Sequence, residues 1–391
     1  MKFYFSAIFI FIVNASFSQK EGNVWVFNNS FSINFDNGKP EVSNKYFAGG
    51  AFGTASLCLK NGRLLFYCYD GRMVFDSTGH FMDGGYLNGS SYPQNVIFIS
   101  HPDPDSSNIY YAFSVHADID KKGLSYSIID MKMRGGRGNI VSSRNRILIL
   151  EGVTSKLTAI KHPNRRDFWL LTWKKNADTI FAYIVTSKGI SAPVKSSTGF
   201  INGGHLKEFA SITPMKLSPD GKKLCAGTDT FSIIADFNAY TGKVSNVWCF
   251  YDNYRYMEFS PKSKFLYLSG GLANKGFIHQ YNLNSKTKEE FINSKVIIGK
   301  QYDSTYYGLM QVAPDGKIYV PEAGAGYLHV INYPDSAGIS CGFKQKVVYL
   351  KGKTSVGALP DMVQSFFQKK TFEYRRSCTR DTVFFAPSNT F

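Results

Sequence analysis

The segment Met215-Lys-Leu-Ser-Pro-Asp-Gly-Lys-Lys-Leu-Cys225 consists of an apolar stretch, a Pro-Asp-Gly turn and a second apolar stretch. Pro presets φ for the turn, Asp bonds the local backbone and Gly takes the positive φ, so the segment predicts one β-hairpin. The pattern recurs in Met257-Glu-Phe-Ser-Pro-Lys-Ser-Lys-Phe-Leu-Tyr267 and in Met310-Gln-Val-Ala-Pro-Asp-Gly-Lys-Ile-Tyr319. This internal repetition is the most informative feature of the chain.

Two further strands are expected after each of the three hairpins. They are Phe231–Phe237 and Val244–Phe250, then Phe277–Asn282 and Ser285–Lys288, then Tyr327–Asn332 and Val347–Leu350. Four strands per repeat, with repeats about 40 to 60 residues apart, are typical of the blades of a β-propeller.

Three weaker copies of the repeat come earlier in the chain. They are Ala55–Tyr69 with Met73–Phe75, the strands between Asn95 and Leu150, and the strands between Leu157 and Ser196. Together with the three clear copies they make six internal blades.

The two ends of the propeller supply the seventh blade. Val24–Phe27 and Phe31–Phe35 lack a preceding partner strand, and Met362–Phe367 lacks followers, so the C-terminal strand is expected to complete the N-terminal blade. Closing the ring in this way removes the exposed edges of an open sheet. The fold class is therefore all-β, a seven-bladed β-propeller closed by N- and C-terminal strands. Two consecutive β-sandwiches are the alternative.

The chain outside the propeller, which spans 19–368, has two parts. Residues 1–18 have a positive start at Lys2, an apolar run and small residues before Gln19, which is the pattern of a secretory signal peptide. The apolar run is too short to cross a bilayer. Residues 369–391 are expected to be a short C-terminal extension, namely a linker and, at Cys378–Phe385, the single first strand of an incomplete Ig/PKD-like domain. A frayed tail is the alternative.

Composition agrees with many short strands joined by tight turns. Aromatic residues make up 16% of the chain and there are 35 glycines, while long helical patterns are missing. The formal net charge is +16, but Lys and Arg are spread along the chain and no recognition helix or zinc finger is visible. Nucleic acid is therefore not expected as a partner. Anionic polysaccharide, lipid headgroups or other surface polymers fit an exported basic protein better.

The six cysteines are expected to be mostly buried free thiols, although an even number in an exported protein invites disulfides. If Asn61-Gly62 forms a two-residue hairpin turn, Cys58 faces Leu65 and Cys68 faces Ala55, out of register for a bridge. Cys225 and Cys249 are expected on the second and fourth strands of one sheet, which is too far apart. Cys341 and Cys378 complete the set.

The same residues carry a resemblance to a known group of proteins. The matching segments are Val24–Phe27, Phe31–Phe35, Asn61–Tyr67, Asn108–Phe113, Gly123–Met131, Lys156–His162, Ser218–Gly221 and Leu359–Phe367. They resemble the secreted propeller region of large Bacteroidetes cell-surface proteins, over nearly all of 23–367. That resemblance implies following PKD or immunoglobulin-like domains and a type IX secretion domain, often labelled gliding-motility-associated. The Pro-Asp-Gly hairpins are also similar to TolB-type and WD40-like repeats. The resemblance implies no catalytic residues.

Motifs for catalysis or cofactor binding are missing from the sequence. It contains no Gly-x-Ser-x-Gly, His-Glu-x-x-His, Cys-x-x-Cys or phosphate loop, and Gly324-Ala-Gly326 is interpreted as a blade turn. No catalytic residue and no cofactor are therefore expected. The metal candidates are His101, Asp103, His116, Asp118 and Asp120, because carboxylates suit Ca²⁺ and imidazole suits Zn²⁺. Ordinary solvated turns explain the same residues and are preferred.

Other conspicuous side chains have packing explanations. His279 and His329 occupy equivalent places in the third strands of two blades, which favours a repeated packing role. Trp169, Trp173 and Trp248 lie in strand patterns and are expected in blade cores, whereas Trp25 is left open between a core and a surface role.

These observations predict a noncatalytic, secreted or cell-surface propeller that acts as a monomeric binding or structural module. Its expected partner is a surface glycan or a protein, and it is not expected to be transmembrane. Because propellers host both binding modules and enzymes, an exported hydrolase, lyase or quinoprotein-like dehydrogenase with a site in the central channel is the alternative. That alternative requires several His, Asp or Glu side chains to converge at the axis.

Overall fold

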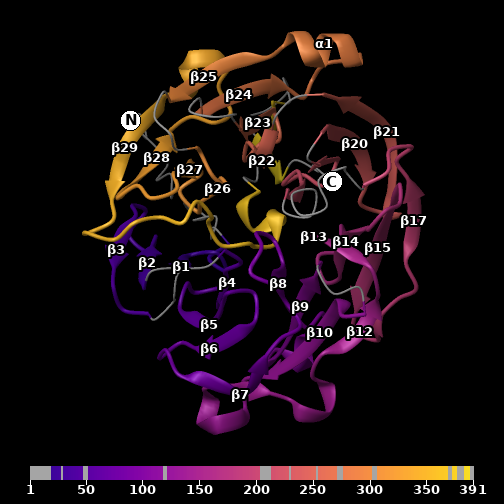
Figure 1. Cartoon of the computed structure of the whole chain (residues 1–391), viewed down its shortest axis with the longest axis vertical. Helices are drawn as coiled ribbons and strands as arrows, with labels where there is room; N and C mark the ends of the chain where they lie inside the picture. Colours follow the sequence, from indigo (N-terminus) through magenta and orange to yellow (C-terminus); the bar gives the residue numbers. More distant parts are fainter. Residues whose placement is uncertain are drawn as a thin grey trace, which may run out of the picture.

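Seven small antiparallel sheets surround a common axis in the computed structural model, and each sheet is one blade of a propeller (Figure 1). Two consecutive sandwiches are therefore ruled out. The structure describes residues 19–27, 30–46, 52–117, 121–202, 213–228, 230–251, 254–270, 276–301, 306–368, 372–376 and 383–387. The predicted signal peptide at 1–18 lies outside these residues. Over the described part of the chain, no helix has the length and apolar character needed to span a bilayer.

The blades follow one another in chain order. Blade 1 contains β1 (Val24–Phe27), β2 (Phe31–Asn34) and β3 (Glu41–Ser43); blade 2 contains β4 (Ala55–Cys58), β5 (Leu64–Tyr69), β6 (Met73–Asp76) and β7 (Phe81–Tyr86). Blade 3 contains β8 (Val96–Ser100), β9 (Ile109–His116), β10 (Gly123–Asp130), β11 (Asn139–Ile140) and β12 (Ile147–Leu150). Blade 4 contains β13 (Val153–Lys161), β14 (Phe168–Lys174), β15 (Thr179–Thr186), β16 (Gly189–Ile190) and β17 (Val194–Ser197).

The last three blades are the clear repeats of the sequence. Blade 5 contains β18 (Met215–Leu217), β19 (Lys223–Gly227), β20 (Ser232–Asn238) and β21 (Lys243–Phe250); blade 6 contains β22 (Tyr254–Phe259), β23 (Phe265–Gly270), β24 (Gly276–Asn282) and β25 (Val296–Gln301). Blade 7 contains β26 (Gln311–Val312), β27 (Ile318–Pro321), β28 (Tyr327–Ile331) and β29 (Phe343–Tyr349). Short 3-10 helices in the loops are η1 (Pro104–Ser106), η2 (Met133–Gly136), η3 (Ser142–Arg144) and η4 (Gly338–Cys341).

The three repeated hairpins have the same turn geometry. Gly221, Ser263 and Gly316 occupy the equivalent position and all have positive φ, at 69°, 54° and 78°. In blade 5 the Ser218 hydroxyl accepts hydrogen bonds from the backbone N–H groups of Lys222 and Lys223, at 3.2 and 2.9 Å. This local satisfaction of backbone donors explains why the Pro-Asp-Gly pattern predicted the hairpins correctly.

Aromatic packing joins the last blade to the first. Trp25 of blade 1 meets Tyr319 of blade 7 edge to face at 5.6 Å between ring centroids, and Phe35 meets the same ring at 5.5 Å. Contacts of this kind contribute about 0.5–1.5 kcal/mol each beyond their buried area. Trp25 is fully buried, so it belongs to the core.

The closing strand predicted at Met362–Phe367 does not form. Within the described residues the sheet of blade 1 has three strands, and Gln364–Phe367 is a 3-10 helix, η5. The segment does lie beside the start of blade 1, because a Cβ added to Gly22 would lie 2.9 Å from Met362 Sδ and 2.9 Å from Phe367 Cζ.

The C-terminal segment crosses the axis instead of joining a sheet. Ala358 forms a parallel bridge with Leu309, Asp361 N–H donates to the Thr54 carbonyl at 2.8 Å, and the Ser365 hydroxyl accepts from Lys161 N–H at 3.1 Å. The segment therefore runs from blade 7 past blade 2 to blade 4.

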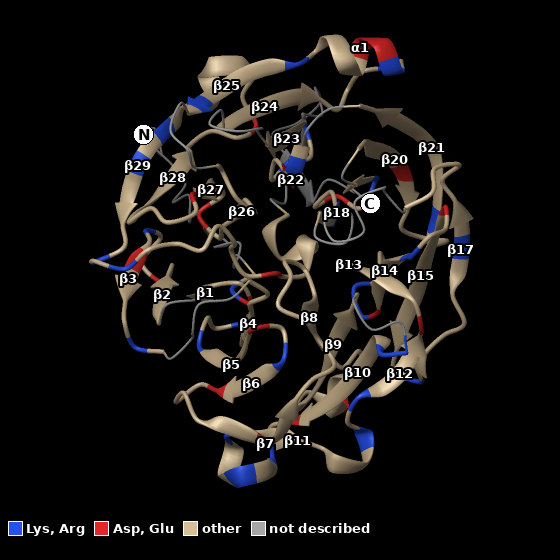
Figure 2. Ribbon diagram, viewed as in Figure 1, with Lys and Arg blue, Asp and Glu red and all other residues tan. Residues whose placement is uncertain are grey.

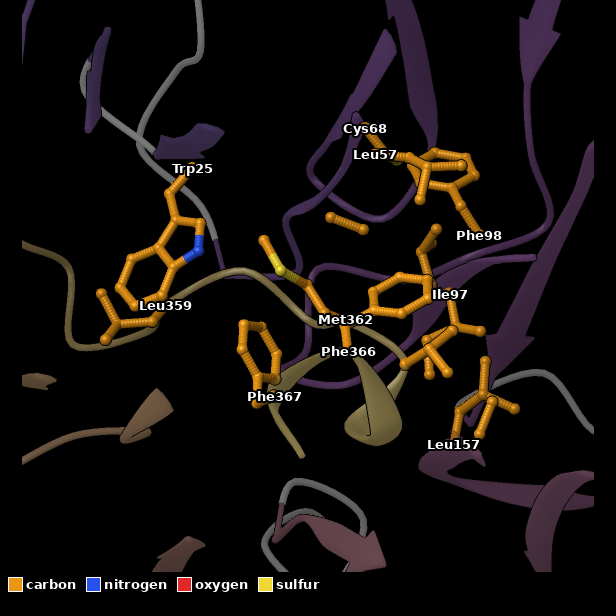
Figure 3. Close-up of a cluster of buried hydrophobic side chains, with 14 of the residues drawn as sticks. Trp25, Leu57, Cys68, Ile97, Phe98, Leu157, Leu359, Met362, Phe366 and Phe367 are labelled. Atoms are coloured by element: carbon orange, nitrogen blue, oxygen red, sulfur yellow. The ribbon is translucent and has the colours of Figure 1, made fainter. Parts of the chain in front are cut away.

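Side chains from several blades surround this segment. Met362, Phe366 and Phe367 are buried, and they lie among Trp25, Leu57, Ile97 and Leu157 from the first strands of blades 1 to 4 (Figure 3). A strand presents its side chains to two opposite faces, whereas a helical turn can pack against neighbours in several directions. The helical turn η5 is therefore better suited than a strand to fill the space at the axis between several blades.

Two further expectations differ from the structure. Ser285–Lys288 is not a strand: α1 (Lys288–Asn293) follows it, and β25 is the fourth strand of blade 6. The Thr287 hydroxyl accepts from Glu290 N–H at 3.1 Å, so Thr-Lys-Glu-Glu is a helix-capping sequence where the repeat pattern predicted a strand.

In the C-terminal extension, β30 (Phe372–Arg376) pairs with β31 (Val383–Pro387), so the strand predicted to be single has a partner.

The five described cysteines are free and buried, as predicted, whereas Cys378 lies outside the described residues. Cys68 lies opposite Ala55 as expected, but Cys58 lies opposite Leu64 and not Leu65, because a register shift interrupts the hairpin. Cys225 and Cys249 lie on the second and fourth strands of blade 5. Burial raises the pKa of Cys58 to about 12, which keeps the thiol protonated and unreactive.

Candidate functional site

A buried ion cluster near the axis joins three blades. Lys216 Nζ donates to Glu258 Oε2 at 2.6 Å, to the Met310 carbonyl at 2.9 Å and to Gln311 Oε1 at 3.1 Å. Lys216 and Glu258 are fully buried. Lys216, Glu258 and Gln311 each follow the methionine that begins a repeated hairpin, so the repeat places them side by side on the first strands of blades 5, 6 and 7.

The oxygens of Glu258 are fully used within the cluster. Oε1 accepts from Phe259 N–H at 2.9 Å, and Oε2 accepts from Val312 N–H at 3.1 Å as well as from Lys216. Burial raises the pKa of Glu258, and the Lys216 ammonium opposes that rise. Buried charges persist when they are paired and hydrogen-bonded, so this geometry serves structure.

Asp361 brings a second carboxyl group close to the same cluster. Burial raises the pKa of Asp361 well above its usual value, with Lys216 opposing and Glu258 adding to the rise. Nearby, Met215 N–H donates to Gln94 Oε1 at 2.6 Å. The carboxyl groups of Glu258 and Asp361 do come close together near the axis, as a channel enzyme requires, but both side chains are buried. Lys216, Glu258 and Asp361 line none of the three cavities described below.

The three metal candidates among the described residues, His101, Asp103 and His116, do not lie together. His101 N–H donates to the Ile109 carbonyl at one end of β9, and His116 is at the other end, roughly 23 Å along the strand. Asp103 caps η1 by accepting from Asp105 N–H at 3.1 Å, which is the turn role that was preferred. Asp118 and Asp120 lie outside the described residues. Among the described residues, no group of three or more His, Cys, Asp or Glu is arranged to hold a metal.

The other conspicuous side chains take packing roles. His279 and His329 lie on the third strands of blades 6 and 7, as predicted; His279 Nδ1 is 2.6 Å from the Tyr254 hydroxyl and His329 Nε2 is 2.8 Å from Glu322 Oε2. Trp169 and Trp173 are buried in the core of blades 4 and 5. Trp248 is partly buried and packs against the core of blades 5 and 6.

A groove of about 840 Å³ opens between the outer strands of blades 3 and 4, and we call it the rim groove. Its walls come from β9, β10 and β12 on one side and from β15 to β17 on the other. The volume falls within the range of about 300–1,000 Å³ typical of ligand pockets. The residues that matter for its chemistry are Tyr111, Tyr126, Phe181 and Tyr183, with Arg144, Lys188 and Lys195.

The aromatic residues of the rim groove are fixed in place by their neighbours. The centroid of the Tyr111 ring is 5.5 Å from that of Phe113 and 5.7 Å from that of His101, and both ring pairs are stacked. Burial raises the pKa of Tyr183 to about 12, so its hydroxyl stays protonated at neutral pH. Lys195 Nζ lies 5.4 Å from the centroid of the Phe181 ring. The groove therefore presents hydroxyl groups, a partly exposed aromatic residue and cations together.

A second cavity of about 560 Å³, the inner pocket, lies closer to the axis. Residues of blades 2, 3 and 4 and Phe366 of η5 line it. Its basic residues are Lys60, Lys161, Arg165 and Arg166, and its acids are Glu21 and Asp103. His101 also lines it, and burial lowers the pKa of this histidine, which favours the neutral ring.

Sequence reasoning missed both cavities. Tyr111 with Phe113 and Phe181 with Tyr183 show the two-residue spacing that places side chains on one face of a strand. That spacing indicates a packed face equally well, because the facing surfaces of blades are normally in contact. Only the separation of blades 3 and 4 at their outer strands turns this face into a groove. Lys and Arg positions are spread around the whole ring in Figure 2, as the sequence suggested.

Comparison with known proteins supplies no function. Neither family models nor curated proteins match the chain. Among solved structures, the chain is similar to a quinoprotein alcohol dehydrogenase-like protein from Bacteroides thetaiotaomicron, with 12% identity, 82% of this chain and 74% of that chain covered and a TM-score of 0.42. It is also similar to the Swd1 β-propeller domain of Myceliophthora thermophila, with 10% identity, 77% and 93% covered and a TM-score of 0.43. At these values the likenesses carry no argument about activity.

Proposed function

We propose that this chain is a noncatalytic binding module of the cell exterior and that the rim groove holds its ligand, a surface glycan or a protein. The predicted signal at 1–18 and the resemblance to secreted Bacteroidetes propellers support export. The observation that carries the proposal is the groove of about 840 Å³, which combines aromatic and hydroxyl groups with cations. Sites of this kind use apolar walls for affinity and a few polar groups for specificity.

The buried ion cluster supports a noncatalytic role. Its carboxyl groups lie on the axis, where a channel enzyme would need them, but Lys216 and backbone N–H groups already occupy the oxygens of Glu258. A general acid or base must come within hydrogen-bond reach of a substrate, and a fully buried group in no described cavity does not.

A glycan array with the purified chain tests the proposal, with Phe181→Ala as the groove variant. Removing a partly exposed ring is expected to weaken binding by about tenfold and to change the free energy of unfolding by less than about 1 kcal/mol. Tyr349→Ala is the matched control, because Tyr349 is an exposed aromatic residue on β29 at a different blade. Equal binding by both variants contradicts the proposal.

Metal analysis of the same sample tests the remaining metal candidates His116, Asp118 and Asp120.

A further inference from the structure

A third cavity lies between the two already described and shares lining residues with each of them. It has a volume of about 350 Å³, and we call it the connecting cavity. Arg166 and the segment 102–104 line both the connecting cavity and the inner pocket. Lys188 lines both the connecting cavity and the rim groove. Shared lining residues place the three cavities next to one another along the boundary between blades 3 and 4, from the outer rim toward the axis, and we call this row of cavities the track.

The outer part of the track is strongly cationic. Arg144, Lys188 and Lys195 line the rim groove, and no Asp or Glu does. All three side chains are exposed, and no ion pair among the described residues uses them. Cations that lack an acidic partner inside a concave surface create a positive potential there, because the low-dielectric walls focus the field.

The inner pocket also carries an excess of positive charge. Lys60, Arg165 and Arg166 are exposed in the inner pocket. Two of the acids along the track already accept hydrogen bonds: Asp103 caps η1, and Asp167 accepts from Asn164 Nδ2 at 2.6 Å. Both acids keep their negative charge, so cations and acids balance in the connecting cavity, whereas cations outnumber acids in the inner pocket and stand alone in the rim groove. Over the whole path seven Lys and Arg residues face three acids, Glu21, Asp103 and Asp167, and this excess favours a ligand with several negative groups.

Two aromatic rings of the rim groove already have partners within the protein. The ring of Tyr111 stacks with His101 and with Phe113, and Lys195 lies over one face of Phe181. Protonated hydroxyl groups of Tyr111 and Tyr183 can donate to or accept from sugar hydroxyls, since burial raises the pKa of both. Stacking on open aromatic faces is what single-stranded nucleic acid requires.

We infer that the ligand is a linear acidic polysaccharide that extends from the rim groove through the connecting cavity to the inner pocket. This inference rests on the proposed function and deepens it by naming the chemical class of the ligand and its path. Carboxylate groups of successive sugar units would meet Arg144, Lys188 and Arg166 in turn, while tyrosine hydroxyls contact the rings.

The test uses the full chain and oligomers of polygalacturonate of increasing length, with binding measured by calorimetry at two salt concentrations. Affinity is expected to increase with length until the oligomer spans the track, and to fall as salt increases. Lys188→Glu and Arg166→Glu are each expected to weaken binding of long oligomers by about tenfold. Arg166→Glu should leave short oligomers that fill only the rim groove unchanged. Lys344→Glu on the exposed edge of blade 7 is the matched control and should bind normally.

Each other outcome overturns the inference. Tighter binding of single-stranded DNA than of polygalacturonate would assign the track to nucleic acid. Equal losses in Lys344→Glu and Lys188→Glu would show a diffuse charge effect. If Phe181→Ala abolishes binding of a neutral glycan while Lys188→Glu and Arg166→Glu bind like the unmodified chain, the proposed function stands and the inference fails. If no glycan binds at all, the inference fails, and of the proposed function only a protein ligand is left to test.

Discussion

At the axis, the Lys216 ammonium and the Glu258 carboxylate are fully buried and 2.6 Å apart, whereas Arg144, Lys188 and Lys195 are exposed in a groove that no acid lines. The same kind of side chain therefore serves two purposes in two parts of one ring. Inside, each charge has partners that compensate for its loss of hydration. At the boundary of blades 3 and 4, the charged groups stay hydrated and can attract a ligand. A charged side chain with buried partners therefore stabilises the fold, whereas one without an acidic partner is available for binding.

The largest expected effect comes from breaking the buried pair. Lys216→Met leaves Glu258 without its ion partner and should lower the free energy of unfolding by about 3–5 kcal/mol, measured by chemical denaturation. The double variant Lys216→Met, Glu258→Leu should recover most of this loss, because it removes the unpaired charge as well. If Lys216→Met is as stable as Lys188→Met, the contrast between the two regions is wrong.

The next effect concerns the C-terminal segment at the axis. Phe367→Ala removes a buried ring that packs near Gly22 and should lower the free energy of unfolding by about 3 kcal/mol through the cavity it leaves. Phe181→Ala in the rim groove serves as the comparison, since its ring is partly exposed. Equal stability of the two variants would mean that the segment does not hold the ring together.

The smallest expected effect is the pH dependence contributed by Asp361. Its pKa is raised in the folded state, so the protein binds this proton more tightly when folded and loses stability as pH rises from near 4 toward the raised pKa. The slope from one such group is at most about 1.4 kcal/mol per pH unit. Asp361→Asn, which keeps an acceptor oxygen, should flatten the stability curve over that range relative to the unmodified chain. Parallel curves from urea denaturation would contradict the shift.

The hairpins could be predicted because their determinants are local. Ser218, Pro219, Asp220 and Gly221 specify a turn within a few residues, and three copies give a period. The repeat pattern predicted a fourth strand where α1 lies, although the Thr287 hydroxyl accepts from Glu290 N–H and caps this helix. The closing strand at Met362–Phe367 was wrong for a different reason. Its apolar composition indicates that the segment is buried. It does not indicate whether neighbours pack on two opposite faces, as around a strand, or on several sides, as around a helical turn.

The candidate site could not be predicted from the sequence. Its walls come from two blades, and the distance between those blades depends on packing around the whole ring. His101 illustrates the limit: beside Asp103 it suggested a metal ligand, whereas the fold stacks it on Tyr111 and separates it from His116 by the length of a strand. The Lys and Arg residues were visible in the sequence, but which of them line the cavities between blades 3 and 4 was not.

By itself, the sequence determined the all-β class, the repeated four-strand unit and the number of blades, because turn chemistry and two-residue alternation act over a few neighbouring residues. Only the tertiary structure decided that the C-terminal segment crosses the axis, that Lys216 and Glu258 neutralise one another, and that blades 3 and 4 separate to form a cationic track. Those features depend on contacts between residues far apart in the chain, whose distances are set by the packing of all seven blades at once.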